Sequence, residues 1–314
     1  MRYHADRLSN EIGHLGYLIA KQAEDLKIKA AIHAAMLQNL ISIEDQFYDL
    51  WDFEFQVFSQ WGEDGILNHI FQRIGIQKPN CVEIGIENFT ECNTRFLAHY
   101  RNSNLYLVDY SPGARLVIDS LDLKWKSKIE FEQCFVTPRN INEILDRAKK
   151  LLGTVDCLSL DVDGMDYWIL ESINQFAFDV IVLEYNSIFG PNQKVSVPYR
   201  ENFIRDTEHF SQTIYGASLA SFIELLKSKG YVFLGTNRVN TNSFFVKESH
   251  SKKFEHLQIR QLVEYTKSNI RESRDEYGKL SFLSLNEVVP EVLDCIVVDT
   301  ITKEELPLRH ILEI

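Results

Sequence analysis

The stretch that decides the fold reads Cys81-Val-Glu-Ile-Gly85, and a similar run follows it, Leu105-Tyr-Leu-Val-Asp109. Both runs are short and apolar on both faces, which is typical of strands in a parallel sheet covered by helices on each side. Between them, Phe96, Leu97 and Tyr100 follow the spacing of one helix face. This strand–helix–strand unit predicts a doubly wound α/β domain.

The same alternation continues on both sides of this unit. A helix around Ser59–Gly75 precedes it, and Thr137-Pro138 offers a capping residue and a helix-starting proline for a helix that ends at Gly153. Another helix is expected from about Ser218 to Lys229, and together these elements place the α/β domain at residues 52–250. Further strands are expected at Ile129–Phe135, Val155–Leu160, Val180–Glu184, Tyr231–Leu234 and Ser243–Val246.

Residues 1–51 are expected to form a helical arm ahead of this domain. The segment holds no proline, and its apolar side chains recur at steps of three and four residues, on one helix face. Two interpretations stay open: the helix packs on its own domain, or it pairs with a second copy of the chain and makes a homo-oligomer. The face consists of Leu8, Ile12, Leu15, Ile19, Ala23, Leu26, Ala30, His33, Leu37 and Leu40.

Residues 251–314 are expected to be an extension of the domain, because they contain apolar runs that need burial. A charged, helix-like segment runs from Phe254 to about Asn269, and Cys295–Asp299 has the pattern of a strand. The sequence assigns this extension no role.

The composition of the 314-residue chain narrows the classes of partner. Hydrophobic residues make up 45% of it, enough for a sizeable core, and a formal net charge of −12 repels the phosphates of nucleic acids. The five cysteines form no CxxC pair, and three of them lie in apolar runs, which favours a reducing compartment. The first residues hold no apolar signal core, and no apolar run is long enough for a membrane span. We therefore expect a soluble, cytoplasmic protein.

Polar side chains follow the predicted strands at the carboxyl edge of the sheet, where doubly wound sheets bind ligands. Asp109 ends the second strand 24 positions after Gly85, and an acidic residue placed there accepts hydrogen bonds from a ribose. Glu87 and Phe89 stand where a dinucleotide motif needs glycines, which disfavours an NAD-linked oxidoreductase. The Glu87 carboxylate repels a diphosphate but not a sulfonium with an amino group, so the pattern favours S-adenosylmethionine.

Several motifs occur together around these strands: Phe58-Ser-Gln-Trp-Gly-Glu-Asp-Gly-Ile66, Val82-Glu-Ile-Gly85, Glu91-Cys-Asn-Thr-Arg95, Leu158-Ser-Leu-Asp-Val-Asp-Gly164 with Asp166-Tyr-Trp168, Val182-Leu-Glu-Tyr-Asn186 and Tyr215-Gly-Ala-Ser-Leu219. Over about residues 55–250, the chain resembles an FkbM-related group of class I S-adenosylmethionine-dependent methyltransferases. The resemblance implies a Rossmann-like, mostly parallel sheet of seven strands whose last strand is antiparallel. It also implies methyl transfer to hydroxyls of sugars or glycans in surface-polysaccharide biosynthesis.

The resemblance further implies roles for single residues in binding the cofactor. Glu83 and Gly85 shape the methionine end of the pocket, with Asn88 in the turn beyond them, and Asp109 takes the ribose. Relatives usually carry a further glycine and an acidic residue in that turn, where this chain has Ile86-Glu-Asn-Phe89.

The remaining implied cofactor contacts come from other segments. The turn at Thr137 lies over the adenine, and Asp161 faces the methionine amino group or the acceptor. Gln60 and Glu63 are expected on the helix that covers the cofactor.

Acidic residues at two neighbouring strand ends form a second candidate site. The carboxylates of Asp161, Asp163 and Glu184 are expected to converge, with Asn186 beside them. Hard oxygen ligands of this kind suit Mg²⁺ or Ca²⁺, and a divalent ion there lowers the pKa of an acceptor hydroxyl. The alternative is that Asp163 and Asp166 only cap the helix that follows them.

A route without metal needs a general base near the acceptor hydroxyl. Asp163 and Glu184 are preferred to His209, because strand ends hold side chains more rigidly than loops do. Aromatic faces pack well on sugar rings, and three tyrosines are candidates for lining the acceptor pocket: Tyr185, Tyr199 and Tyr215.

These residues predict an S-adenosylmethionine-dependent O-methyltransferase acting on a sugar, nucleotide-sugar or glycan hydroxyl. The alternative is a non-catalytic module that keeps the methyltransferase fold for binding or assembly. The unusual turn Ile86–Phe89 and the helical arm favour that alternative.

Overall fold

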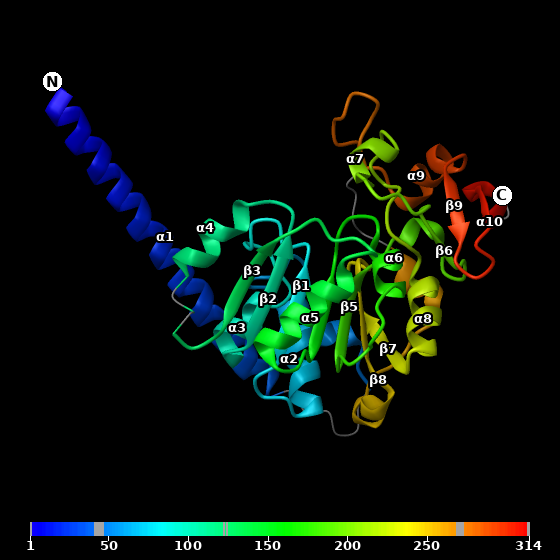
Figure 1. Ribbon diagram of the computed structural model, residues 1–314, viewed down its shortest axis with the longest axis horizontal. Helices are drawn as coiled ribbons and strands as arrows, with labels where there is room; N and C mark the ends of the chain where they lie inside the picture. Colours follow the sequence, from blue (N-terminus) through cyan, green and yellow to red (C-terminus); the bar gives the residue numbers. More distant parts are fainter. Residues whose placement is uncertain (1, 41–46, 122, 124, 268–272, 313–314) are drawn as a thin grey trace.

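A computed structural model describes residues 2–40, 47–121, 123, 125–267 and 273–312, with the side chains of residues 2–13 and 17 outside the description. Its centre is a seven-stranded sheet in the order β3-β2-β1-β4-β5-β8-β7 (Figure 1). The strands are β1 Asn80–Ile84, β2 Asn104–Asp109, β3 Ile129–Gln133, β4 Cys157–Leu160, β5 Val180–Glu184, β7 Tyr231–Thr236 and β8 Asn242–Lys247.

The directions of the strands confirm the expected Rossmann-like arrangement. The five strands from β3 to β5 pair in parallel, while β8 runs antiparallel to both of its neighbours, β5 and β7. The predicted closing strand at Ser243–Val246 is this antiparallel β8. From β1, the strands that follow in the chain extend the sheet in both directions, with β2 on one side and β4 on the other. In doubly wound sheets, ligands bind beyond the carboxyl ends of the strands at such a switch point.

Helices cover both faces of the sheet, because alternate residues of each buried strand point to opposite sides. In β2, Leu105 and Leu107 pack with α1, α2, α3 and α4, whereas Tyr106 and Val108 pack with α5, α6 and α8. The helices are α1 Arg2–Gln38, α2 Glu63–Ile74, α3 Arg95–Arg101, α4 Gly113–Ser120, α5 Ile141–Leu152, α6 Asp166–Glu171, α7 Arg205–Glu208, α8 Leu219–Ser228, α9 Leu285–Val292 and α10 Leu308–Ile311.

Two expectations about helices are wrong. The helix predicted from Thr137-Pro138 begins only at Ile141, because Asn140 accepts from the Thr137 backbone N–H and donates to the Phe135 carbonyl, which closes a turn first. The helix predicted over 254–269 is absent from its described part, 254–267, where the chain instead leaves the 3₁₀ helix η3 Glu248–Phe254 and forms a second one, η4 Leu262–Thr266. Residues 268 and 269 lie outside the described residues. Backbone hydrogen bonds between Tyr48 and the strand-like stretch 256–258 compete with helix formation there.

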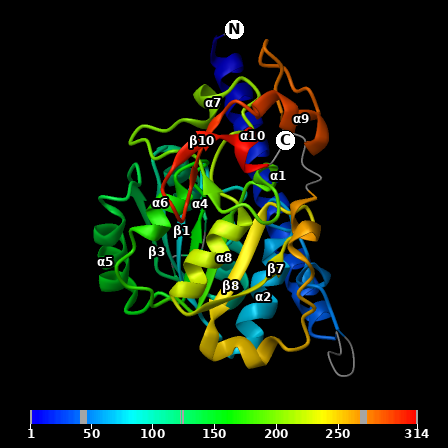
Figure 2. The same ribbon diagram turned by 90° about the vertical axis from the view of Figure 1, so that its right-hand side faces the viewer.

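The C-terminal extension is joined to the domain through a second, small sheet. Its strands β9 Ile296–Asp299 and β10 Glu305–Pro307 pair with each other, and β9 also pairs with β6 Val195–Ser196 of the main domain. Figures 1 and 2 show β6, β9 and β10 gathered with α7, α9 and α10 at one end of the molecule. The predicted strand Cys295–Asp299 is therefore present as β9.

The arm forms the long helix α1, of which only the C-terminal part packs on the domain (Figure 1). Ala31, Ala35 and Gln38 are buried, and the Gln38 amide donates to the carbonyls of Phe53 and Gly65 while accepting from Asn68. The predicted stripe residues Leu8 and Ile12 lie outside the described side chains. Within the described part of the chain, every helix is too short or too polar to span a bilayer.

Candidate functional site

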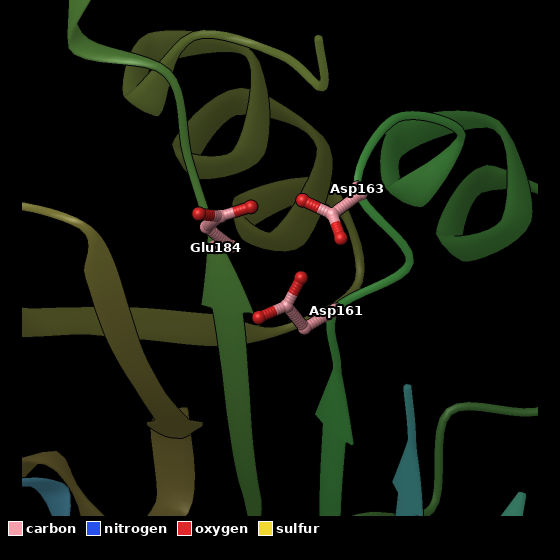
Figure 3. Close-up of side chains that lie close together, drawn as sticks. All are labelled: Asp161, Asp163 and Glu184. Carbon is pink, nitrogen blue, oxygen red and sulfur yellow. The ribbon is translucent and has the colours of Figure 1, made fainter. Parts of the chain in front are cut away.

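Three carboxylates meet at the carboxyl edge of the sheet (Figure 3). Glu184 is the last residue of β5, Asp161 directly follows β4, and Asp163 lies in the turn beyond it. One oxygen of each carboxylate lies within 4.8 Å of the others. The predicted convergence of these side chains is confirmed, because parallel neighbouring strands end at the same edge.

A close approach of two backbones sets the position of Asp161. Gly85 follows β1 with φ +82°, and its N–H donates to the Val108 carbonyl while the Asp161 N–H donates to the Ile84 carbonyl. A Cβ on Gly85 would stand 1.5 Å from the Asp161 carbonyl oxygen. Only glycine fits this position, so Gly85 determines how closely the turns after β1 and β4 pack.

The neighbouring acids Asp163 and Asp166 have different roles. The Asp166 carboxylate accepts from the backbone N–H groups of Val162 and Gly164, which precede the helix. Asp166 is itself the first residue of α6, which has no side-chain cap, so it holds the turn before the helix and the capping interpretation is wrong. Asp163 adopts a left-handed conformation with φ +55° in the turn that Asp166 holds. Its side chain is free of that turn and pairs with Arg205, Nη1 to Oδ1 at 2.7 Å.

The acid cluster is short of positive charge. Burial raises the pKa of Glu184 well above its usual value, and the charges of Asp161 and Asp163 raise it further. Burial and then Asp163 raise the pKa of Asp161 in the same way. Glu184 Oε2 is buried and has no hydrogen-bond partner among the described residues. Such an oxygen favours either a proton or a bound cation.

The raised pKa of Glu184 predicts that unfolding free energy falls as pH rises. The folded state holds the Glu184 proton to a higher pH than the unfolded state, so stability is lost between the unfolded and folded pKa values. Glu184→Gln removes this ionisation, so we expect the variant to be more stable than the parent at pH 8, with a smaller difference at pH 5. Urea unfolding at both pH values measures this.

Glu130→Gln, on an exposed position of β3, is the matched control and should change stability little at either pH. A difference between Glu184→Gln and the parent that is constant with pH would contradict the assignment of a raised pKa.

Asp109 lies at the end of β2, as predicted, but much of its carboxylate is already engaged. Oδ2 accepts from the backbone N–H groups of Ile86 and Glu87 at 2.9 and 2.8 Å, and Oδ1 accepts from Ser111 at 2.7 Å. Asp109 therefore holds the turn after β1 in place. A carboxylate has about four lone-pair sites, which leaves Asp109 roughly one for a ligand.

The other residues expected to contact the cofactor fall into two groups. Glu83 is buried and accepts from the backbone N–H groups of Asn93 and Thr94, and burial raises its pKa. Glu63 is buried beneath Asn237 and Asn242, whose amides donate to it. Both carboxylates serve local structure and are closed to solvent.

Three further predicted contacts lie nearer the surface. Gln60 precedes α2 instead of lying on it, since the helix begins at Glu63 after a left-handed Gly62. Asn88 is exposed and accepts from Thr90 within its own turn. Thr137 is half-buried in the turn before α5.

Asn186 and His209 have partners away from the three acids. The Asn186 amide donates to the carbonyls of Thr213 and Tyr215, and its oxygen accepts from the Ile188 N–H. The His209 ring lies by Ser211, 2.8 Å from its hydroxyl, and burial lowers the pKa of this histidine.

The residue that sequence reasoning missed is Arg205. Its guanidinium carries the charge nearest the acids and lies over the Tyr215 ring, 3.9 Å from the centroid. The Tyr215 hydroxyl in turn points at Glu184 Oε1, 3.4 Å away. Arg205 stands 42 positions after Asp163 in the chain, and no local pattern signals their contact.

A partly open pocket continues from this pair. Arg205, Tyr215 and Asn186 line one side of it, and Leu285 and Val288 of α9 line another. Its volume is about 520 Å³, counted with its open mouth. The C-terminal extension therefore forms a wall of the cavity next to the acid cluster.

Comparisons with known proteins identify no family for this chain. No protein-family model matches the chain, and no curated protein is significantly similar. Among solved structures, the N-terminal domain of EvdMO1, crystallised in the presence of SAH and D-fucose, has a TM-score of 0.37 at 12% identity, covering 69% of this chain and 94% of that one.

Two other solved structures are similar to the same degree. An S-adenosylmethionine-dependent methyltransferase from Clostridium acetobutylicum has a TM-score of 0.34 at 11% identity, covering 69% of this chain and 97% of that one. An O-methyltransferase family protein from Burkholderia thailandensis has a TM-score of 0.33 at 11% identity, covering 59% and 57%. Similarities this low carry no functional argument, so the site itself must supply it.

Proposed function

We propose that the protein is an S-adenosylmethionine-dependent O-methyltransferase that acts on a hydroxyl of a sugar, nucleotide-sugar or glycan. The observation that carries this proposal is the cluster of Asp161, Asp163 and Glu184 at the carboxyl ends of β4 and β5, with a buried and unpaired Glu184 oxygen. A role in surface-polysaccharide biosynthesis stays a prediction from the resemblance of the sequence motifs.

The proposed binding site for the cofactor lies where the strand order reverses. Asp109 is placed at the end of β2 to accept one hydrogen bond from a ribose hydroxyl. The turn that Asp109 holds carries the exposed Glu87. Asp161, close to Gly85, is the nearest carboxylate for the amino group of the methionine part.

In the proposed reaction, Glu184 takes the proton of the acceptor hydroxyl. S-adenosylmethionine supplies a methyl group on a cationic sulfur: the carbon–sulfur bond breaks with its electrons staying on sulfur as the oxygen–carbon bond forms. Burial raises the pKa of Glu184, so the carboxyl must first lose its proton; once ionised, Glu184 is a stronger base than an ordinary carboxylate. Asp163, held by Arg205, orients the acceptor from the other side.

A divalent cation bound by the three carboxylates remains part of the proposal, as an alternative to a proton held on Glu184. Asp161, Asp163 and Glu184 supply hard oxygen donors that fit Mg²⁺, and Figure 3 shows their carboxylates turned toward one another. Bound there, Mg²⁺ would lower the pKa of a hydroxyl. Arg205 competes for Asp163, so the cation would have to displace this ion pair.

The pocket beside the cluster is the proposed acceptor site. Its lining includes the Tyr215 ring, over which Arg205 lies, and the hydroxyl-bearing side chains of Thr213 and Ser273. Aromatic faces and neutral hydrogen-bonding groups suit a sugar ring.

A non-catalytic binding module is the second candidate function. The observation that favours it is the engagement of Asp109 by three backbone N–H groups, which leaves little capacity for a ribose. In this alternative the fold serves assembly, and the helix α1 provides the contact surface.

Calorimetric titration with S-adenosylhomocysteine, with and without Mg²⁺, distinguishes the two functions. We expect saturable binding by the full chain and none with NAD. Asp109→Asn should weaken the affinity roughly tenfold or more, because it removes a charge-assisted hydrogen bond. Thermal melting of the variant checks that the turn is intact.

The outcomes separate the claims. Absence of heat with S-adenosylhomocysteine would overturn the methyltransferase proposal and support the binding module. Unchanged affinity in a folded Asp109→Asn would show that the ribose lies elsewhere.

A further inference from the structure

The helix α1 presents an apolar face that the domain does not cover. The inner face packs on the domain through residues that include Ala31, Ala35 and Gln38, and Glu24 of this face pairs with Arg95 of α3 at 2.7 Å. The opposite, outer face carries large exposed hydrophobic side chains, with Leu26 and Leu37 each 66% exposed. The outer face consists of Leu15, Leu18, Ile19, Leu26, Ile32, Met36 and Leu37, and the exposed Leu40 follows in the turn just beyond the helix.

The outer face has the spacing of a coiled-coil seam. Positions at alternating steps of four and three residues run along this face over nearly four heptads, and five of the eight are apolar. The seam positions are Leu15, Ile19, Gln22, Leu26, Lys29, His33 and Met36 of α1, followed by Leu40 in the turn just beyond the helix. All eight side chains are exposed in the single chain.

The three polar seam residues discriminate between possible partners for this face. If a second copy paired in parallel and in register, Lys29 would face Lys29 of the partner copy across the seam, and like charges there are destabilising. Polar side chains would also face their own copies at Gln22 and His33.

An antiparallel pair removes these conflicts. With the twofold axis between residues 27 and 28, Leu15 lies opposite Leu40 of the partner copy, and Ile19 lies opposite Met36. Gln22 then meets His33 of the partner copy, a donor–acceptor match.

The last layer sets Leu26 against the aliphatic stem of Lys29 of the partner copy. The residue opposite Asp25 is residue 30 of the partner copy, so the Lys29 ammonium of that copy is only one residue away from Asp25. Sliding the partner by one heptad either way sets Leu26 or Leu40 against Gln22 of the partner copy. The antiparallel register places Leu15 and Ile19 against apolar side chains of the partner copy and keeps the two lysines apart, with Leu26 against Lys29 as its one mixed kind of layer.

We propose that the outer face of α1 binds the outer face of a second copy of this chain as an antiparallel helix pair. In one chain, α1 extends away from the domain, which packs against its C-terminal part (Figure 1). An antiparallel pair would therefore hold the two domains at its opposite ends. This proposal does not depend on the proposed enzymatic function.

Light scattering on the full-length protein tests the association. We expect twice the mass of one 36.5 kDa chain for the parent and the mass of one chain for Leu26→Glu. Leu116→Glu, at a 79% exposed position on α4, is the matched control and should remain dimeric. Both leucines are exposed, so neither substitution should disturb folding, which circular dichroism checks.

Cysteine cross-linking with a short bismaleimide tests the register. The background carries Cys134→Ser and Cys295→Ser, which remove the two partly exposed thiols. Ile19→Cys or Met36→Cys alone should give almost no cross-linked dimer, whereas the double variant should cross-link efficiently.

Each outcome decides the proposal. Efficient cross-linking of either single variant would overturn the antiparallel register in favour of a parallel pair. A parent protein of single-chain mass would overturn the association, and if it also sedimented with phosphatidylcholine vesicles, a lipid surface would be the partner of the outer face.

Discussion

Gly85→Ala is expected to lower the free energy of unfolding by at least about 4 kcal/mol, or to prevent folding. The added Cβ would stand 1.5 Å from the Asp161 carbonyl oxygen, and both groups belong to backbones that cannot rotate away. The turn after β4 would have to move, and with it the first carboxylate of the acid cluster. Chemical denaturation followed by circular dichroism measures the loss.

Gly75→Ala is the matched control, because Gly75 has nearly the same backbone conformation, φ +87°, and a Cβ added there would meet nothing within 4 Å. At that position alanine adds only the strain of the left-handed region, about 1–2 kcal/mol. Equal losses in the two variants would show that conformation alone, and not the approach of β4, accounts for Gly85.

Glu184→Gln is expected to reduce methyl transfer by roughly a hundredfold or more, because it removes the proposed general base. Affinity for S-adenosylhomocysteine should stay close to that of the parent, since no predicted cofactor contact is lost. The rate is followed by the release of S-adenosylhomocysteine from S-adenosylmethionine in the presence of a panel of sugars and nucleotide-sugars.

The expected gain in stability of Glu184→Gln at pH 8 makes this result interpretable. A variant that folds better and turns over more slowly cannot owe its slow turnover to unfolding. Glu130→Gln should keep the parent rate. Full activity of Glu184→Gln would leave Asp163 as the candidate base and would remove Glu184 from the mechanism.

The apolar runs that begin at Cys81 and Leu105 were enough to predict the central strands. Both became strands close to their predicted limits, and so did the runs at 180–184 and 243–246. The stop of α2 at Gly75 was also visible, since glycine is the residue that favours the left-handed C-cap found there. These features depend on neighbours in the chain, which a sequence displays directly.

The predictions that were wrong depended on competition from side chains nearby or far away. Asn140 closed a turn that delayed the start of α5. Tyr48, more than two hundred residues earlier in the chain, paired with the stretch predicted as a helix after Phe254. Neither competitor is visible from helix propensity alone.

The candidate site also combines features that the sequence predicted with features that depend on contacts between distant residues. That Asp161, Asp163 and Glu184 would share one edge followed from strand order, because parallel strands deliver their carboxyl ends together. No sequence pattern predicted the cation beside these acids, because Arg205 lies 42 positions from Asp163 in the chain. Nor did a pattern predict that Asp109 uses most of its hydrogen-bond acceptor capacity on the turn after β1. Periodicity is a local property that residues carry with them, whereas hydrogen bonds and ion pairs between distant segments exist only once the sheet has brought those segments together.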